Sequence, residues 1–578
     1  MSKRWIIKNV NPKLQVTLSD SLKVHPIIAQ LLINREITSV NEAKNFLEAD
    51  LSGLHDPFLF KNMDKVVERI RLAAQRKEKV LVFGDYDVDG VTSSVLMHDL
   101  LTGMGIEVIN HIPHRVHDGY GLNHEIAEMA KSEGVRLLIT VDCGISAKAE
   151  VETLNRLGID VIVMDHHEPT EDTIPDAFAI INPKQKDCPY PFHELASVGL
   201  VAKLAQAIHG RVNPDMLDFV ALGTIADVAP LCDENRIFVK AGLPRISRSK
   251  NLGLQALLEI AKITGKEITP YYVGFILGPR INATGRMDSA HKSLDLFLSQ
   301  TKEVALDCAR VLEKYNSDRQ KMQKDTVNEA LALVEIQADI EGHKVIVLGK
   351  EGWHKGVLGI VASKIAEKYY RPAIVISIEE GIGTASARSI EGFHLHDALV
   401  ECAAMLENFG GHECAAGLTI KEENIDHFRT LINTIADKVL QPKKLVPTLY
   451  VDCDIPLSSA TLSLAEIINA MEPFGEGNPT PVFCSRNVIV KSYPAVLGKD
   501  TLKFWVTDGQ HTVSAVGFGM GKYAGTIKPG EKIDLAYELI IDDWNKAPTA
   551  QLKLKDIRLG QDLQSDIENI LEERKVTL

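Results

Sequence analysis

The chain has 578 residues, enough for several domains, and its 45% hydrophobic and 25% charged residues are ordinary for a globular protein. Its formal net charge of -14 argues mildly against a nucleic-acid partner, although a basic groove can coexist with acidic outer faces. No stretch approaches the roughly 18 apolar residues of a membrane-spanning helix, and the first apolar run is too short for a signal peptide. The 8 cysteines lack C-x-x-C spacing, which predicts reduced thiols. We therefore expect a cytoplasmic protein without a membrane partner.

The first 230 residues divide into two parts. Residues 1–60 are rich in Leu, Ile and Asn and predict helices that end at the Asp56-Pro57 breaker. After them, short apolar runs alternate with helical patterns, which predicts right-handed βαβ crossovers and a mainly parallel sheet. The expected strands cover residues 80–83, 106–112, 135–141, 159–164 and 178–182.

Three carboxylates follow the first of these strands at alternate positions. Asp85, Asp87 and Asp89 precede a helix expected over residues 91–101, in the place where α/β sheets bind ligands. Carboxylates this close raise one another's pKa unless a cation neutralises them, so a divalent metal ion is the simplest explanation. A calcium-binding EF-hand loop would need Glu at its twelfth position, which is Leu96 here. A solvated acidic turn is the remaining alternative.

Further acidic and histidine residues end later apolar segments. Asp142 follows the strand in VRLLITVDCG, and the strand in DVIVMDHH ends in Asp165, His166 and His167. Asp227 ends the apolar segment FVALGTIAD. Carboxylate and neutral imidazole ligands suit Mn²⁺ or Mg²⁺, whereas a structural zinc site would need a pair of thiolates, which these motifs lack. A single His-His pair would more often be structural, but the repetition of acidic segment ends favours a metal site.

Two polar segments carry candidate nucleic-acid contacts. Arg115 and Tyr120 lie in RVHDGY, which is either a surface turn or a site where Arg binds phosphate and the Tyr ring stacks on a base. Arg280, Asn282 and Arg286 lie in GPRINATGRMDSA, which we expect to be a glycine-rich loop that approaches a nucleic-acid backbone. The alternative is a surface loop in which arginine pairs with the aspartate of the same motif.

A long helix and a second α/β lobe follow. Residues 302–337 contain neither Pro nor Gly and predict one helix that connects two lobes. The second lobe, about residues 343–440, contains strands, an amphipathic helix and the glycine-rich motif GGHECAAG. Backbone amides, a hydroxyl, a guanidinium and an imidazole together predict a phosphate pocket, with glycines that serve only tight turns as the alternative. The candidate pocket residues are Arg388, Ser389, Gly411 and His412.

The last part of the chain is rich in short strands. Between residues 446 and 560, repeated strand patterns with one helix predict a small Greek-key barrel of OB type. Such barrels bind single strands through aromatic stacking and cationic edges. Residues 562–578 predict a short charged helix.

These motifs together resemble a known family. GDYDVDG, VDCG, DHH and GTIADVAPL, in this order, resemble the DHH phosphoesterase superfamily, and GGHECAAG resembles the associated DHHA1 domain. RVHDGYGLN, GPRINATGRMDSA and SARS are similar to the RecJ family of bacterial exonucleases within it. The resemblance implies an α/β fold: a DHH parallel-sheet domain, a connector helix, a smaller DHHA1 domain and an OB-type barrel. The expected boundaries are 1–60 for the N-terminal helices, 61–300 for DHH, 301–340 for the connector, 341–442 for DHHA1, 446–560 for the barrel and 561–578 for the last helix.

The superfamily pattern, carried over position by position, implies a role for each site residue. Two divalent ions are expected, with Mn²⁺ favoured over Mg²⁺. His167 would contact the scissile phosphate, and Asp85 would orient a metal ligand. Many relatives have His four residues before the first ligand, where this chain has Phe83, so we expect the first ion to be less fully held by protein. The expected ligands are Asp87 on the first ion, Asp89, His166 and Asp227 on the second, and Asp142 on both.

The resemblance implies a metal-dependent exonuclease that hydrolyses single-stranded DNA from 5′ to 3′ into 5′-mononucleotides, in DNA recombination and repair. Single-strand-binding protein and a helicase are the implied partners, and a monomer is expected. One alternative is a DHH phosphodiesterase acting on short oligoribonucleotides or cyclic dinucleotides. Another is a non-catalytic scaffold in a replication complex, although such a scaffold would be expected to have lost metal ligands that are present here.

Overall fold

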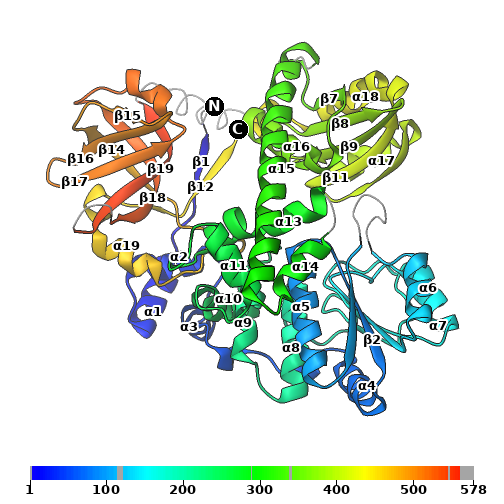
Figure 1. Ribbon diagram of the computed structural model, residues 1–578. Coiled ribbons are helices and arrows are strands. Elements are labelled where there is room, and N and C mark those ends of the chain that lie inside the picture. The colour runs from blue at the N-terminus through cyan, green and yellow to red at the C-terminus, as the bar shows by residue number, and fades with distance from the viewer. Residues whose placement is uncertain (1–2, 114–120, 288–289, 338–341, 544–546, 560–578) are drawn as a thin grey trace. The chain divides into compact units, whose positions relative to one another are not determined.

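The computed structural model describes residues 3–113, 121–287, 290–337, 342–543 and 547–559 (Figure 1). The chain divides into a large unit, Ala49–Leu445, and a barrel unit formed by Met1–Glu48 together with Val446–Leu578. The helix expected over 562–578 lies outside the described residues. None of the described helices combines the length and the apolar content that crossing a lipid bilayer requires.

A parallel five-stranded sheet is the framework of the first half of the large unit. Its strand order is β3-β2-β4-β5-β6, and every neighbouring pair is parallel, which confirms the predicted sheet. β2 and β4 are buried along almost their whole length because the sheet is covered on both faces. The strands are β2 (Lys79–Gly84), β3 (Glu107–His111), β4 (Leu137–Val141), β5 (Asp160–Met164) and β6 (Ala179–Ile181).

Helices cover both faces of this sheet (Figure 1). Val80 and Val82 of β2 pack in one core with α4, α5 and α8, whereas Leu81 and Phe83 pack in the other with α6 and α7. Successive strand residues thus enter opposite cores, as the alternation of side chains along a strand requires. The helices are α4 (Met63–Arg76), α5 (Val88–Gly103), α6 (His124–Ser132), α7 (Lys148–Arg156) and α8 (Ser197–His209).

A group of helices leads from this sheet to the long helix α15 (Lys302–Gln337), whose bounds confirm the predicted connector. α11, α13 and α14 pack against α15. The group consists of α9 (Leu217–Ala226), α10 (Asp233–Ile246), α11 (Leu252–Ile260), α12 (Pro270–Tyr272), a π-helical segment (Val273–Leu277), α13 (Gly278–Met287) and α14 (His291–Phe297).

The second lobe of the large unit is a mixed five-stranded sheet with the order β10-β11-β9-β8-β7. α15 and α16 pack on one face of it, and α17 and α18 pack on the other. The strands are β7 (Ile346–Glu351), β8 (Ala373–Glu379), β9 (Ile382–Arg388), β10 (Leu406–Gly411) and β11 (Ala415–Lys421). The helices are α16 (Leu358–Tyr369), α17 (Leu395–Glu401) and α18 (Ile425–Val439).

The barrel unit contains the predicted OB-type barrel. Strand β14 pairs with β18 and, at Ile489 and Val490, also with β16, so the sheet curls back on itself and partly closes. The strands are β12 (Thr448–Val451), β13 (Cys453–Asp454), β14 (Phe483–Val490), β15 (Ala495–Leu497), β16 (Thr501–Thr507), β17 (Thr512–Phe518), β18 (Lys532–Asp542) and β19 (Thr549–Leu559), and the helix is α19 (Leu462–Asn469).

The N-terminal residues belong to this barrel unit. α1 (Pro12–Leu22), α2 (Pro26–Ile33) and α3 (Val40–Glu48) are helices, as predicted. The expected helical segment also contains a strand, β1 (Arg4–Ile7), which pairs in parallel with β12. The partner strand lies more than 440 residues away in the sequence, so no local pattern could reveal this pairing.

Candidate metal centre

The predicted metal-site residues gather at the carboxyl ends of β2, β4 and β5, which are neighbours in the parallel sheet. Asp85 and Asp87 follow β2, Asp142 directly follows β4, and His166 is the second residue after β5. Asp227 comes from a helix instead, because it ends α9 as its C-terminal capping residue. Four separate segments therefore contribute to one site.

In the turn between β2 and α5, one of the carboxylates is fixed because it caps the N-terminus of the helix. The Asp87 side chain accepts a hydrogen bond from the Gly90 backbone N–H at 3.1 Å and so caps the N-terminus of α5. A Cβ atom at position 90 would lie only 2.4 Å from the backbone oxygen of Asp85. This turn therefore requires glycine, because only glycine lets the helix start so close to the end of the strand.

The turn after β4 has a sparsely populated backbone conformation. Asp142 has a φ of 64°, a region that non-glycine residues rarely adopt, and its backbone N–H donates to the Met164 carbonyl at 3.0 Å. Gly144 has a φ of 107°, and a Cβ atom there would lie 2.7 Å from Thr140 Oγ1. Such strain costs about 1–3 kcal/mol and is common at functional sites. Here it aims the Asp142 carboxylate at the end of the neighbouring strand.

Asp89 is held by a helix from a distant part of the sequence. Its two carboxylate oxygens accept hydrogen bonds from the backbone N–H groups of Ser197, at 2.7 Å, and Val198, at 2.9 Å. These N–H groups begin α8, and the positive end of a helix dipole favours a negative charge. α8 therefore fixes the position of Asp89 and favours its ionised form.

The side chains are close enough to share ions. His166 Nε2 lies 3.2 Å from Asp142 Oδ1, and His166 Nδ1 lies 3.9 Å from Asp227 Oδ2. In each of three groups, one potential ligand atom per residue lies within 4.8 Å of the others. Asp142 and His166 each belong to two groups, so they lie where adjacent ions could share ligands. The groups are Asp85, Asp87 and Asp142; Asp89, His166 and Asp227; and Asp142, His166 and His167.

Burial and mutual repulsion disfavour negative charge in this cluster. Burial and the charge of Asp87 raise the pKa of Asp89 to about 7, and burial with the charges of Asp89 and Asp87 raises the pKa of Asp227 to about 8. Burial and the neighbouring carboxylates raise the pKa of Asp142 well above its ordinary value. Burial and the neighbouring His167 lower the pKa of His166 to about 4, so His166 is a neutral imidazole at pH 7.

This donor set fits divalent metal ions. Carboxylate oxygens and neutral imidazole nitrogens are ligands that Mn²⁺ accepts, and Mg²⁺ prefers the carboxylates. A doubly charged ion would remove the repulsion that raises the pKa of the aspartates and would return them to their ionised form. The cluster therefore has both the ligands and the uncompensated charge expected of a metal site.

His167 is oriented by Asp165, a residue to which the sequence analysis assigned no role. Asp165 Oδ1 lies 2.7 Å from His167 Nδ1 and also accepts the His167 backbone N–H, while Oδ2 accepts the N–H of Ile145 at 3.0 Å. Burial opposes protonation of His167, but the hydrogen bond and charge of Asp165 outweigh it and raise the pKa of His167. Because Nδ1 is engaged, Nε2 is the ring nitrogen that can approach a phosphate or an ion.

The expected glycine-rich loop over GPRINATGRMDSA is wrong, because Gly278–Met287 form helix α13. Pro279 is tolerated in the first turn of this helix, directly after the π-helical segment. The glycines permit close packing: a Cβ atom at Gly278 would lie 3.6 Å from Ala226 Cβ, and one at Gly285 would lie 3.0 Å from the Tyr86 carbonyl oxygen. α13 therefore runs beside the turn that carries Asp85 and Asp87 and beside the end of α9 that carries Asp227.

The predicted contact residues on α13 have different surroundings. Arg280 Nε pairs with Glu313 of α15 at 2.6 Å, so its guanidinium is already matched by a carboxylate. Asn282 Oδ1 is buried and has no hydrogen-bond partner among the described residues. Arg286 Nη1 donates to the Gly356 carbonyl at 3.2 Å and so connects α13 to the second lobe. Asn282 thus has an unmatched acceptor, and Arg286 lies where the two lobes meet.

The predicted phosphate-pocket residues come together at one edge of the second sheet. Ala415 pairs with Arg388, and Ala416 pairs with Gly411, so β11 joins the two motifs. The Ser389 hydroxyl donates to the Phe393 carbonyl at 2.7 Å, and the His412 N–H donates to the Ala415 carbonyl at 2.8 Å. The members of this edge are Arg388, Ser389, Gly411 and His412.

Arg388 also lies near the connection to α13. A Cβ atom at Gly359 would lie 3.0 Å from Arg388 Nη2, and Gly359 lies in the first turn of α16, three residues after Gly356. Arg286, Gly356, Gly359 and Arg388 therefore form a continuous row from α13 to the edge of the second sheet. Arg115 and Tyr120 lie outside the described residues, so the structure does not place them.

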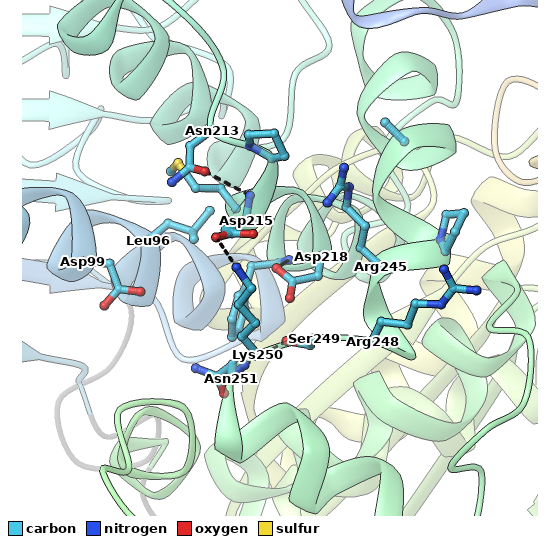
Figure 2. A pocket seen from close by; sticks show the side chains of 15 residues that line it. Leu96, Asp99, Asn213, Asp215, Asp218, Arg245, Arg248, Ser249, Lys250 and Asn251 are labelled. Atoms are coloured by element: carbon cyan, nitrogen blue, oxygen red, sulfur yellow. Dashed lines mark hydrogen bonds and ion pairs between the residues drawn. The ribbon is translucent and has the colours of Figure 1, made fainter.

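A separate cavity of about 670 Å³ lies beside α9 and α10 (Figure 2). Asp218, Arg245 and Arg248 are among its lining residues, and Lys250 pairs there with Asp215 at 2.9 Å. None of the predicted site residues lines this cavity. The candidate metal centre at the strand ends is therefore separate from this cavity.

Three family models match the chain. The DHH family, N-terminal domain, matches residues 79–224, the DHHA1 domain matches residues 342–438, and the RecJ OB domain matches residues 451–556. The first match spans β2 to α9, the elements that carry most of the aspartates and both histidines.

Known proteins resemble nearly the whole chain. The single-stranded-DNA-specific exonuclease RecJ of Bacillus subtilis is 38% identical over 561 residues, which are 96% of this chain and 71% of that protein. A crystal structure of RecJ from Thermus thermophilus in complex with Mn²⁺ superposes with a TM-score of 0.82 at 29% identity, covering 96% of this chain and 79% of that one. A structure of RecJ from the same organism with Mg²⁺ superposes with a TM-score of 0.77 at 26% identity, covering 96% and 78%.

Proposed function

Because this chain belongs to the RecJ family of single-stranded-DNA-specific exonucleases, we propose that it removes nucleotides from the 5′ end of single-stranded DNA and releases 5′-mononucleotides. It is a hydrolase of the DHH family, and its cofactors are divalent ions, Mn²⁺ or Mg²⁺. The observation that carries the proposal is the cluster in which Asp142 and His166 each belong to two potential ligand groups.

The proposed ligands are those of the cluster. Asp142 would serve both ions, with Asp87 on the first and Asp89, His166 and Asp227 on the second. When bound there, two divalent ions would supply Lewis-acid stabilisation of the attacking and leaving oxygens of an in-line displacement. The position of each carboxylate is fixed because each is held by its own turn or helix end.

Other residues would position the strand. His167, oriented by Asp165, would contact the scissile phosphate through Nε2, and Asp85 would orient a ligand from the same turn. Asn282 and Arg286 on α13 would contact the backbone beside the cut bond. The row from Arg286 to Arg388 supports a further proposal: the edge with Arg388, Ser389, Gly411 and His412 binds the 5′-terminal phosphate.

Two alternatives are less well supported. A non-catalytic scaffold does not need a complete ligand cluster, yet every predicted ligand is present and close to the others. A phosphodiesterase for short oligoribonucleotides or cyclic dinucleotides does not need the RecJ OB domain matched at residues 451–556. Single-stranded DNA is therefore the better substrate.

The cellular context is also a proposal. The described cysteines are all free thiols, which suits the reducing cytoplasm. Single-strand-binding protein and a helicase as partners, action as a monomer, and a role in recombination and repair follow from the family resemblance alone. Co-purification from the native cell and size-exclusion chromatography with light scattering would test partners and oligomeric state.

The test is degradation of a 5′-phosphorylated single strand that carries a label at either the 5′ or the 3′ end. The wild-type protein with Mn²⁺ or Mg²⁺ is expected to release labelled mononucleotide from the 5′ end first, and EDTA is expected to stop the reaction. Loss of residues that merely support metal ligands costs about 10- to 100-fold in activity. Asp142→Ala, which removes a ligand common to two groups, is therefore expected to cost more than about 100-fold.

Asp215→Ala is the matched control, because Asp215 lies in the separate cavity and its carboxylate pairs with the exposed Lys250. It should degrade the strand at the wild-type rate. Release from the 3′ label first would contradict the proposed polarity. Retained strand binding without degradation by the wild-type protein under either metal would favour the scaffold.

A further inference from the structure

Two stacked aromatic rings are exposed on the helical run that leads into α13. Tyr271 and Phe275 are 59% and 69% exposed, with ring centroids 5.2 Å apart and planes inclined by 26°. Single exposed apolar residues are common on protein surfaces, but two large rings that stack on each other in solvent form one larger exposed apolar patch. The predicted functional residues do not include this pair.

The pair shares a helix face with residues of the proposed DNA path. The backbone is helical from Pro270 to Met287 through α12, the π-helical segment and α13. Residues three or four positions apart lie on one face of a helix. Positions 271, 275, 279, 282 and 286 are three or four residues apart, and the wider π-helical turn at Val273–Leu277 shifts the rings by only part of a turn, so the rings lie on the same side of this helical run as Asn282 and Arg286.

The distance from Phe275 to Asn282 along the helix is close to the length of a few stacked nucleotides. Seven residues separate Phe275 from Asn282, which at about 1.5 Å per residue is about 10 Å. Stacked nucleotides of one strand rise about 3.4 Å each, so about three of them span the same distance. A positive charge is also present, because Lys266 Nζ lies 5.7 Å from the ring centroid of Tyr272, the neighbour of Tyr271. Aromatic faces beside a cationic group are the usual elements of a single-strand binding surface.

We propose that Tyr271 and Phe275 stack on bases of the single strand a few nucleotides away from the cut bond. The proposal rests on the proposed function and adds a surface for the bases, whereas Asn282, Arg286 and the edge with Arg388 are proposed to contact the phosphate backbone. Every base has an aromatic face, so stacking tolerates any sequence. Bases inside a duplex are already stacked on one another and cannot meet these rings, so the pair would also favour single-stranded over double-stranded DNA.

The test measures binding without cleavage. Fluorescence anisotropy in EDTA would give the affinity for a 5′-phosphorylated single strand, and 2-aminopurine at successive positions would report stacking through quenched emission. Phe275→Ala and Tyr271→Ala are each expected to weaken binding roughly 5- to 150-fold, the range of base–aromatic stacking, and to remove the quenching at one or two positions. Phe58→Ala is the matched control: Phe58 is an aromatic residue of the large unit, 52% exposed, at a place unrelated to α13.

Abasic nucleotides separate stacking from a structural role. When abasic nucleotides replace the quenched positions, the affinity of the wild-type protein for the strand should fall to that of Phe275→Ala. The affinity of Phe275→Ala itself should not fall any further. Unchanged affinity and quenching in both aromatic variants, or an equal loss in Phe58→Ala, would overturn the proposal and leave a protein partner as the occupant of the rings. Because cleavage is not measured, a failure of the exonuclease assay would count against the proposed function and not against the stacking surface.

Discussion

Asp165 does not belong to any of the three potential ligand groups, yet it holds one of the two histidines in place. Its carboxylate accepts three hydrogen bonds, two of them from His167, and is almost fully buried. Burial alone would raise the pKa of Asp165, but the bonds from His167 and Ile145 outweigh it and lower that pKa. Asp165 therefore remains ionised and acts as a positioning residue for the His167 ring.

Asp165→Asn is expected to lower kcat about 10- to 100-fold, because the amide cannot accept hydrogen bonds at both atoms and no longer fixes the imidazole. KM for the strand should change little. The measurement is a double-mutant cycle with His167→Ala, in which Asp165→Asn should cost almost nothing further. If Asp165→Asn lowers kcat by the same factor in the His167→Ala background as in the wild type, Asp165 acts through its hydrogen bond with the backbone of Ile145 instead.

At the scale of elements, the site depends on how closely α5 starts after β2. Only three residues, Asp85, Tyr86 and Asp87, connect the end of β2 to the start of α5. Asp87 is both the N-terminal cap of α5 and a potential metal ligand. Gly90 makes this possible because its missing side chain leaves room for the backbone of Asp85. The same tight turn therefore determines both the start of α5 and the spacing of the carboxylates.

Gly90→Ala is expected to weaken Mn²⁺ binding at least about tenfold and to cost about 1–3 kcal/mol of stability, because backbone atoms cannot rotate away from the new Cβ. Isothermal titration calorimetry and thermal unfolding would measure the two effects. Gly103→Ala on the same helix is the control: apart from the adjacent residues and the backbone of the helix itself, no described atom lies within 4 Å of a Cβ there, so this change should be neutral or slightly stabilising. Wild-type metal affinity in Gly90→Ala would show that the turn adjusts without moving its carboxylates.

At the scale of the whole molecule, the first and last parts of the chain form one unit. Leu18, Leu31 and Phe46 from the N-terminal helices belong to the same buried cluster as the barrel interior. Asn34 donates to the Asp452 carbonyl at 2.9 Å, and β1 pairs with β12. The large unit, which carries the metal centre, is by contrast one continuous segment.

Deleting residues 1–48 is therefore expected to unfold the barrel unit and spare the large unit. Fully burying each large apolar side chain contributes about 1.5–3 kcal/mol, so the five largest from the deleted helices contribute about 8–15 kcal/mol, comparable to the stability of a domain. Calorimetry of residues 49–578 should show the loss of one unfolding transition, and residues 49–445 alone should fold and bind Mn²⁺. As the control, residues 1–48 co-expressed with residues 446–578 should restore the unfolding transition of the barrel unit. An intact barrel transition in residues 49–578 alone would contradict the prediction.

The sequence by itself determined the parallel sheet, the connector helix and the barrel, and it predicted the carboxylates and histidines that the structure brings together at the strand ends. These features follow from local patterns: hydrophobic periodicity marks strands and helices, and polar residues directly after parallel strands must meet at one edge of the sheet. Asp85, Asp142 and His166 could be grouped on this argument alone. Asp165 could also have been assigned a role, because it lies in the same triplet as the histidines.

Only the tertiary structure decided the features that depend on residues far apart in the chain. GPRINATGRMDSA contains the usual residues of a loop, but its first ten residues, Gly278–Met287, form α13, and two of its glycines allow this helix to pack closely on Tyr86 and next to Ala226. Asp89 is bound by Ser197, 108 residues away, and β1 pairs with a strand more than 440 residues away. No local pattern encodes such contacts, because their stabilisation arises only when the whole fold brings the partners together.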